Sequence, residues 1–306
     1  MSARKTELDA LAMGLMLIFS VLWGFNQVAV KVANESIPPL FQSGLRSTGA
    51  SILIALWCIF RRVDLFGRDR SLWPGIAAGV LFAAEFGLIY WGLEFTTASR
   101  GIVFLNTSPF VVAAGMHWLM PAERLSWRQI GGLACAFAGV GAAFAENLSI
   151  PTGRQWIGDG MMLAAAVLWG ATTVLVRTTV LARIAPEKTL LYQLAVSAIC
   201  LFAAAALAGE PFVVNPSILG SASLAWQIVI VAFASYLGWF WLIKRYPATR
   251  LAAFTFLAPL FGMGFGAALL GEPVGPPLIF ALAMVAAGLW LINRRPNLVP
   301  IRQVEG

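Results

Sequence analysis

The sequence has few charged residues and little that could bind a metal or form a disulfide. Only 11% of its 306 residues are Asp, Glu, Lys or Arg, against roughly 25% in an ordinary soluble domain. That is too few to cover a water-soluble surface of this size. The three cysteines, Cys58, Cys135 and Cys200, lie far apart in apolar stretches without CxxC or CxxH spacing, which excludes a disulfide scaffold or a zinc site.

Residue patterns typical of enzymes are also lacking. The sequence has a single histidine, His117, and contains neither an HExxH motif nor a Walker loop of the form GxxxxGK[ST]. The last apolar segment has no lysine that could form a Schiff base with retinal. An intramembrane enzyme is therefore a weak alternative, and we expect no catalytic residue, no metal and no cofactor.

Long apolar segments fill the chain, of which 59% is hydrophobic. A transmembrane helix needs about 20 mostly apolar residues, and this criterion predicts an all-α polytopic membrane protein with ten spans. They lie near residues 11–32, 38–60, 73–93, 98–119, 128–146, 157–177, 187–208, 224–243, 249–270 and 275–293. These spans leave no room for a soluble domain.

The net charge of +7 reflects where the loops lie. With ten spans both termini share one side of the membrane, and most basic residues fall on that side: Arg4, Lys5, Arg61, Arg62, Arg68, Arg70, Arg124, Arg128, Arg183, Lys188, Lys244, Arg245, Arg294, Arg295 and Arg302. The opposite side receives little more than Lys31, Arg100 and Arg154. Because basic loops stay in the cytoplasm, we expect cytoplasmic termini, the lipid bilayer as a partner and no nucleic-acid partner.

The chain repeats itself. Ser20-Val-Leu-Trp23-Gly24 matches Ala166-Val-Leu-Trp169-Gly170 at a spacing of 146 residues. Two further matches have a spacing of 150 residues, Ala98-Ser99-Arg100 with Ala248-Thr249-Arg250 and Ser108-Pro109 with Ala258-Pro259. Residues 1–150 and 151–306 are therefore predicted to be two five-helix repeats.

Five spans per repeat have a mechanical consequence. Because five is odd, the second repeat enters the membrane from the opposite side, so the two repeats are inverted and related by a pseudo-two-fold axis in the membrane plane. Two such halves have two packings of similar energy, which is what alternating access to a central site requires. The repeat thus favours a secondary transporter.

The same motifs resemble a known family. The Trp-Gly pair in the first helix of each repeat, the Gly-Leu-Glu-Phe-Thr-Thr-Ala-Ser stretch at 92–99, Pro109, Pro259 and the Gly271-Glu272 loop are similar to the EamA pattern of the drug/metabolite transporter superfamily. The resemblance covers essentially the whole chain. It implies two inverted five-helix bundles in a bacterial inner membrane and export of small metabolites. Among bacterial members the chain resembles amino acid exporters of the YddG type.

Polar and aromatic side chains in the first span of each repeat are candidates for a central cavity. Trp23 and Asn26 share one helix face, and Trp169 and Thr172 have the same spacing at equivalent repeat positions. Polar residues in spans are expensive and face a cavity or another helix. The alternative is that they form hydrogen bonds between helices, with the tryptophans as interface anchors.

Glu85 is the most informative of these candidates. It is predicted to be the only acid deep within a span, and its repeat counterpart is Ser235. A carboxylate at this depth would hold a substrate ammonium or take a proton. The alternative is a structural carboxyl that a neighbouring helix satisfies.

Arg46 is the corresponding base. Counted from the ends of their helices, Arg46 and Glu85 each lie eight residues in, a depth of roughly 12 Å. Arg46 would bind a substrate carboxylate, neutralise Glu85, or extend its side chain to water.

Further residues complete the predicted site. Tyr236 and Trp239 share a face and would wall an apolar substrate side chain, and Asn106 faces the same way as Phe110 in the fourth span. Pro109 and Pro259 interrupt backbone hydrogen bonding at equivalent positions and are candidate hinges. The Gly262-x-x-x-Gly266 spacing permits close helix contact but specifies no oligomer.

These features predict a secondary transporter that exports small metabolites, most simply amino acids with aromatic or other apolar side chains. An exporter of hydrophobic cations or drugs is the alternative, because a lone acid and aromatic walls would suffice for such a substrate. A facilitated exporter needs no titratable coupling residue, so proton coupling and facilitated export both stay open.

Overall fold

The structure is a computed structural model that describes residues 5, 7–67, 69–92, 94–96, 98–145, 150–151, 153–270 and 276–293. The predicted loop arginines Arg4, Arg68, Arg294, Arg295 and Arg302 and the Gly271-Glu272 loop lie outside these residues.

The described part of the chain is helical and contains no strand. The first half forms α1 (Ala10–Asn34), α2 (Pro39–Phe60), α3 (Leu72–Gly92), α4 (Ala98–Leu105), α5 (Ser108–Leu119), the short 3₁₀ helix η1 (Pro121–Glu123) and α6 (Trp127–Ala143). The second half forms α7 (Gln155–Thr178), η3 (Val180–Ala182), α8 (Pro186–Leu207), α9 (Ile218–Trp226), the π-helix η4 (Gln227–Ser235), α10 (Tyr236–Arg245), α11 (Ala248–Ala253), η5 (Phe254–Phe256), α12 (Leu257–Leu270) and α13 (Pro276–Asn293).

Each of the ten predicted spans coincides with one of these helices or with a consecutive series of them. Seven stretches are long and apolar enough to cross a membrane by themselves: 10–34, 39–60, 72–92, 155–178, 186–207, 218–245 and 248–265. The other three spans are the interrupted pair α4 and α5 and the shorter helices α6 and α13. The prediction of an all-α polytopic membrane protein is therefore confirmed, although the eighth span begins six residues earlier than expected, at Ile218.

Local sequence explains where the helices begin. The Asp9 carboxylate accepts the N–H of Ala12 at 3.0 Å and caps α1, and Ser126 with Gln129 forms a capping box at the start of α6. Pro39 and Pro186 occupy the first positions of α2 and α8, where a missing N–H costs nothing.

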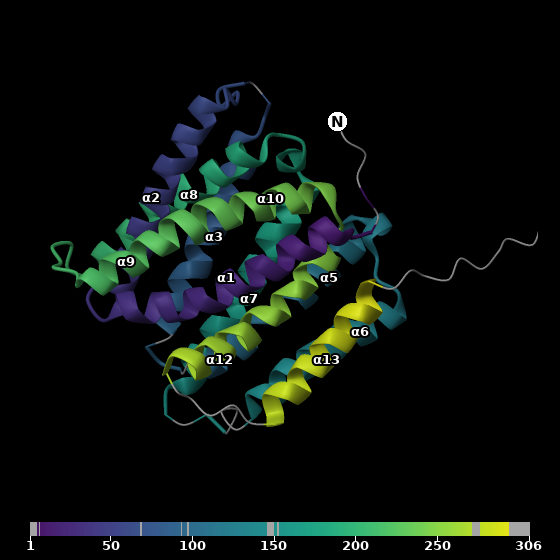
Figure 1. Cartoon of the computed structure of the whole chain (residues 1–306). Coiled ribbons are helices and arrows are strands. Elements are labelled where there is room, and N and C mark those ends of the chain that lie inside the picture. Colours follow the sequence, from purple (N-terminus) through teal and green to yellow (C-terminus); the bar gives the residue numbers. More distant parts are fainter. Residues whose placement is uncertain are drawn as a thin grey trace, which may run out of the picture.

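The helices pack in pairs that the repeat relates to one another. α1 packs along α12, and its counterpart α7 packs along α5. α2 packs against α8 and α6 against α13, each with its own counterpart; Figure 1 shows α6 and α13 side by side at one edge of the bundle. Gly24 of α1 lies against Ala258 and Gly262 of α12, so the Gly262 contact is made within the chain. The division of the chain at residues 150 and 151 stays a prediction.

One face of the bundle, termed the N-side here, is defined by the start of α1. The backbone N–H of Lys5 donates to Arg245 O at 2.9 Å, and the Tyr246 hydroxyl donates to Asp9 at 2.9 Å. The N-side therefore also holds the end of α10 and the start of α11, which follows directly.

Candidate functional site

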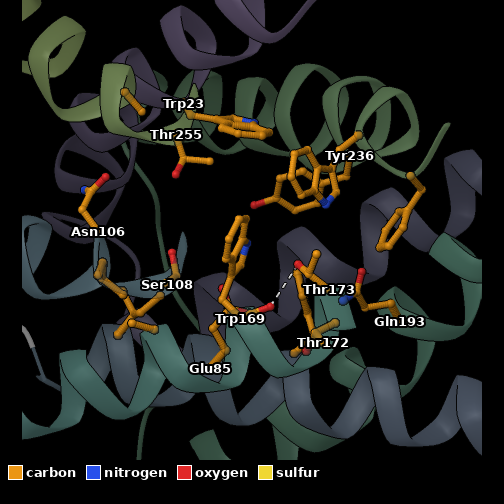
Figure 2. Close-up of a pocket in the computed structure, with 17 residues that line it drawn as sticks. Trp23, Glu85, Asn106, Ser108, Trp169, Thr172, Thr173, Gln193, Tyr236 and Thr255 are labelled. Carbon is orange, nitrogen blue, oxygen red and sulfur yellow. Dashed lines mark hydrogen bonds between the residues drawn. The ribbon is translucent and has the colours of Figure 1, made fainter. Parts of the chain in front are cut away.

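A cavity of about 190 Å³ lies among the helices of both repeats. Figure 2 shows its polar and aromatic side chains pointing inward from facing helices. Of the nine predicted binding residues, seven line it: Trp23, Glu85, Asn106, Trp169, Thr172, Tyr236 and Trp239. The lining also includes Phe82, Ile89, Leu105, Ser108, Ala166, Thr173, Gln193, Phe240, Thr255 and Ala258. Their role in binding stays a prediction.

Aromatic rings form one wall of the cavity. Trp239 lies between the two repeat-related tryptophans, with ring centroids 5.9 Å from Trp23 and 5.6 Å from Trp169. Tyr236 approaches Trp23 edge to face at 6.5 Å. The indole N–H of Trp23 donates to the Ser235 hydroxyl at 2.9 Å, which fixes its orientation. This wall suits an apolar or aromatic group.

Glu85 projects from α3 into the cavity and is only 4% exposed. It is the one acidic residue in the lining among the described residues. Its Oε2 atom has no hydrogen-bond partner within the part of the chain that the structure describes. A buried polar atom of this kind is expensive unless something pairs with it, so the carboxyl is placed to receive a donor from a ligand or from water.

Arg46 is fully buried in α2 and does not line the cavity. Its guanidinium carbon lies 3.8 Å from the ring centroid of Phe86, and none of its three nitrogens finds a hydrogen-bond partner among the described residues. Full burial argues against the alternative in which the side chain extends to water. The other alternative, a direct ion pair with Glu85, is not formed between the described atoms. The equal depth of the two residues along their helices does not bring their charges into contact.

Interruptions in two spans place polar groups in the cavity. The fourth span breaks at 106–107, just before Pro109, and the ninth passes through η5, just before Pro259. A proline lacks the N–H that would continue the preceding turn, so the predicted kinks are breaks in the α-helix. Asn106 and Thr255 line the cavity from these interruptions.

The polar side chains predicted on the repeat-related helices α1 and α7 differ in position. Asn26 of α1 is half-buried and lies outside the cavity lining, and its Oδ1 has no partner among the described residues. The hydroxyls of Thr172 and Thr173 donate to the carbonyls of Leu168 and Trp169 at 2.9 and 3.1 Å. Both threonines line the cavity, and a hydroxyl that donates keeps lone pairs that can accept a hydrogen bond.

The cavity is sealed toward the N-side. Five buried residues close it from α5, α7 and α11, with Trp169 packed on top of them: Val112, Met116, Val174, Ala248 and Ala252. Beyond this apolar layer an ion pair joins Arg177 at the end of α7 to Glu123 of η1.

Sequence reasoning missed part of the lining because it selected polar and aromatic residues and carried only some of them across to their repeat counterparts. The repeat itself carries the signal: Leu105 and Thr255, separated by 150 residues, both line the cavity, and so do Ser108 and Ala258. Carrying Trp239 across to its counterpart would have identified Ile89, which also lines the cavity.

Several known proteins share this architecture. A protein of known crystal structure superposes with a TM-score of 0.80 at 18% identity, covering 93% of this chain and 96% of that chain. A "probable amino-acid metabolite efflux pump" of Salmonella typhimurium is 26% identical over 90% of this chain and 93% of its own length. An "uncharacterized transporter" of Archaeoglobus fulgidus is 25% identical over 92% of this chain and 97% of its own length.

The profile of the EamA-like transporter family matches the chain twice, over residues 10–144 and again over residues 156–294. These two matches fall within the two predicted repeats and cover most of the helices that surround the cavity. The chain is thus a multi-pass membrane protein that belongs to the EamA-like transporter family, as its repeated motifs predicted.

Proposed function

We propose that the protein exports small zwitterionic metabolites, most simply amino acids with apolar or aromatic side chains, by alternating access to the central cavity. The observation that carries this proposal is Glu85, a buried carboxyl that lines the cavity without a partner among the described residues. A substrate ammonium would supply the missing donor in a charge-assisted hydrogen bond. The substrate side chain would lie against Trp239 and Tyr236.

The size of the cavity supports a small substrate. Its volume of about 190 Å³ lies below the roughly 300–1,000 Å³ typical of sites for drug-sized ligands. The relative from Salmonella typhimurium, whose name refers to amino-acid metabolite efflux, is similar along nearly its whole length. Its substrate class is carried over to this chain as part of the proposal.

Export requires the N-side to face the cytoplasm. The described basic residues at the N-side ends of the helices support this orientation: Arg61, Arg62, Arg70, Arg124, Arg128, Arg183, Lys188, Lys244 and Arg245. Positively charged loops stay cytoplasmic. In a bacterial inner membrane with this orientation, transport from the N-side to the opposite side is export from the cell.

Pro109 and Pro259 are proposed hinges. Each follows an interruption in a span that lines the cavity, where fewer backbone hydrogen bonds resist bending. Because the two interruptions occupy equivalent repeat positions, bending at one and straightening at the other would exchange the accessible side. We infer that the transport cycle involves no covalent chemistry.

Efflux from proteoliposomes loaded with radiolabelled amino acids tests the proposal. Wild-type protein is expected to release at least one apolar or aromatic amino acid, and Glu85→Gln to lose at least about nine-tenths of that rate, since a neutral amide cannot form an ion pair with an ammonium. Glu94→Gln is the matched control, because Glu94 is exposed at the end of α3. Release of no amino acid by the wild type would refute the substrate class.

A hydrophobic-cation exporter is the second candidate, favoured by one observation. Arg46, the expected partner for a substrate carboxylate, lies outside the cavity lining. A lone carboxylate among aromatic rings suits a cation. In the same vesicles, Arg46→Gln would impair amino acid export through the loss of a nearby positive charge, whereas cation export would survive it or increase.

A further inference from the structure

Trp23 and Ser235 form a hydrogen bond whose repeat-related counterpart is missing. The indole N–H of Trp23 in α1 donates to Ser235 Oγ at the end of η4. The repeat carries Trp23 to Trp169 and Ser235 to Glu85. Yet among the described residues the indole of Trp169 donates no hydrogen bond, and Oε2 of Glu85 accepts none. Trp169 instead lies beside Trp239, with ring centroids 5.6 Å apart.

Helix packing supports the equivalence of Ser235 and Glu85. Gly49 of α2 packs directly on Ile228, and Gly79 of α3 packs directly on Val196 of α8. Gly49 and Val196 each lie ten residues after the proline that opens their helix, so Ile228 and Gly79 occupy equivalent positions.

Ser235 lies seven residues after Ile228, whereas Glu85 lies six residues after Gly79. The extra residue lies within the π-helix η4, and a π-helix accommodates an additional residue in the same helical length. Ser235 and Glu85 are therefore counterparts in space as well as in sequence.

The two sides of the membrane are not in equivalent states. On the N-side, α11 packs against both α5 and α7, around the apolar layer that includes Val112 and Ala252. The counterpart of the α11–α5 contact on the opposite side, between α4 and α12, is not packed in this way within the described residues. The structure is thus closed on the N-side and more open on the other.

In an inverted-repeat transporter, the opposite state is reached when the two repeats exchange conformations. The bond from Trp23 to Ser235 belongs to the state closed on the N-side. We propose that, in the state open on the N-side, the indole of Trp169 turns away from Trp239 and donates to the Glu85 carboxylate. Trp169 would then occupy the acceptor that a substrate ammonium uses.

This inference rests on the proposed function for the substrate but adds a role that the proposed function lacks. Trp169 competes with the substrate for Glu85 on the side from which the substrate enters. A charged ammonium is a stronger donor than an indole N–H, so substrate displaces Trp169. In the empty carrier, the bond between Trp169 and Glu85 stabilises the state open on the N-side and favours its return after release.

Cysteine accessibility tests the exchange without any substrate. Cys58, Cys135 and Cys200 are replaced by alanine, and Val112→Cys is introduced as a reporter, because Val112 is fully buried in the N-side seal. A membrane-impermeant maleimide is applied from the N-side, and its rate of reaction reports how often that side opens. Ala252→Cys in the same seal serves as a second reporter.

The two tryptophans are expected to act in opposite directions. Trp169→Phe keeps an aromatic ring but removes the donor, and should lower the labelling rate at least about threefold, as expected for one hydrogen bond. Trp23→Phe removes the bond of the N-side-closed state and should raise the rate by a similar factor, and Ser235→Ala should do the same. A role in packing alone would shift both tryptophan variants in the same direction.

Labelling shifts of the same sign, no shift in Trp169→Phe, or no labelling of either reporter in any variant would overturn the inference. Thermal unfolding of each variant shows that it is folded. If the wild type transports no amino acid while the labelling rates shift in opposite directions, the proposed substrate fails and the exchange at Glu85 stands. If amino acids are transported, Trp169→Phe is expected to slow net efflux more than exchange, because only net efflux requires the empty carrier to return.

Discussion

Arg177 and Glu123 form a buried ion pair that joins the end of α7 to η1. Nε and Nη2 of Arg177 both donate to Oε1 of Glu123, while Oε2 accepts the backbone N–H of Ala248 at 2.8 Å. Arg177 also donates to the carbonyl of Ile243 at 2.8 Å. One carboxylate and one guanidinium thus connect α7, η1, α10 and α11 next to the apolar seal on the N-side.

Glu123→Gln is expected to loosen this seal. The substitution leaves the Arg177 charge buried without a partner charge, and breaking a buried pair in this way costs about 3–5 kcal/mol. Maleimide labelling of Val112→Cys from the N-side should rise at least tenfold, because the penalty falls on the closed state. Glu94→Gln, at an exposed position, should leave the rate unchanged. Equal labelling in both variants would show that the ion pair does not hold the seal.

The spans could be predicted from the sequence because bilayer thickness fixes the length of an apolar run. The position of a residue along its helix could also be predicted, since helical rise is constant. The direction in which a side chain points could not be predicted. Arg46 and Glu85 are equally far from the ends of their helices, yet the guanidinium of Arg46 lies against Phe86 and not against the carboxyl of Glu85. Helical rise sets height, whereas packing of neighbouring helices sets which way a side chain turns.

Buried ion pairs at the ends of helices could likewise not be predicted from the sequence. The sequence predicts Arg100 only as one of the few basic residues on the side opposite the termini, whereas in the structure it is 4% exposed and forms an ion pair with Asp159 of α7, with Nη2 and Oδ2 2.5 Å apart. The two residues are 59 positions apart, and no local pattern links them. Their pairing depends on α4 and α7 meeting, which is a property of the fold.

Arg46→Met is expected to impair transport without lowering the stability of the protein. The guanidinium is buried with no hydrogen-bond partner among the described residues. The substitution replaces this buried charge with an apolar side chain and so removes its desolvation cost. The melting temperature in detergent should stay the same or rise, while amino acid efflux falls at least about tenfold. A drop of more than about 5 °C would mean that the native guanidinium is paired.

Gly24→Ala is expected to destabilise the contact between α1 and α12. A Cβ at this position would lie 2.7 Å from the carbonyl oxygen of Ala258 and 2.8 Å from the backbone nitrogen of Gly262, so the helices must separate, at a cost of about 1–3 kcal/mol. Gly14→Ala in the same helix is the matched control, because its Cβ would meet nothing within 4 Å. That control should be neutral or slightly stabilising, since alanine is the better helix former. Thermal unfolding of the two variants checks the difference, and similar melting temperatures would contradict it.

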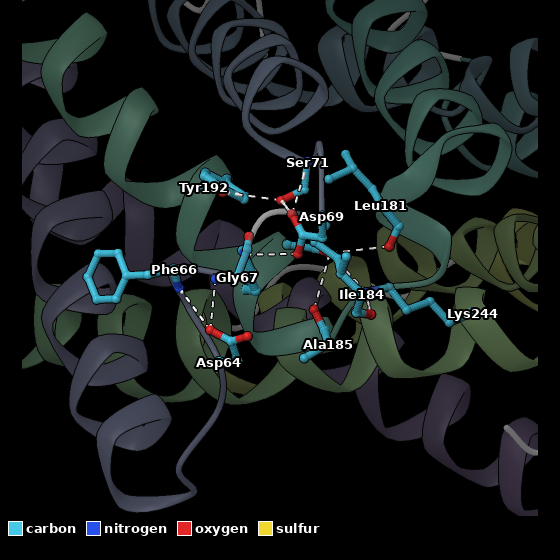
Figure 3. Close-up of polar contacts among 12 residues, drawn as sticks. Asp64, Phe66, Gly67, Asp69, Ser71, Leu181, Ile184, Ala185, Tyr192 and Lys244 are labelled. Atoms are coloured by element: carbon cyan, nitrogen blue, oxygen red, sulfur yellow. Dashed lines mark hydrogen bonds and ion pairs between the residues drawn. The ribbon is translucent and has the colours of Figure 1, made fainter.

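Asp69 gives a prediction about pH. Its carboxylate accepts hydrogen bonds from Ser71 and from Lys188, at 2.5 and 2.9 Å, and holds the loop between α2 and α3 onto α8 (Figure 3). These bonds, from Ser71 first and then Lys188, lower the pKa of the Asp69 carboxyl to about 2. A lowered pKa means that the stabilisation is complete above the unfolded value of about 3.9 and is lost as the pH falls through the folded value.

The melting temperature of Asp69→Asn should therefore lie below that of the wild type by a constant amount between about pH 5 and 8. The gap should close as the pH falls from about 4 toward 2. Asp64→Asn is the control, because among the described residues the Asp64 carboxylate accepts hydrogen bonds from backbone N–H groups of its own loop, those of Phe66 and Gly67. A gap that persists unchanged near pH 2 would show that the charge of Asp69 contributes nothing.

Ile89 is expected to limit the size of the substrate. It lines the cavity at the position that the repeat relates to Trp239, whose indole fills the corresponding space between Trp23 and Trp169. Ile89→Trp would fill the second space as well, so the Michaelis constant for phenylalanine or tryptophan should rise at least about tenfold while that for alanine changes little. Ile89→Ala should lower the discrimination between large and small substrates, because even one methylene group in an apolar pocket is worth about 1–3 kcal/mol. Competition between labelled phenylalanine and unlabelled alanine in proteoliposomes measures both effects, and an unchanged ratio in Ile89→Trp would place the substrate side chain elsewhere in the cavity.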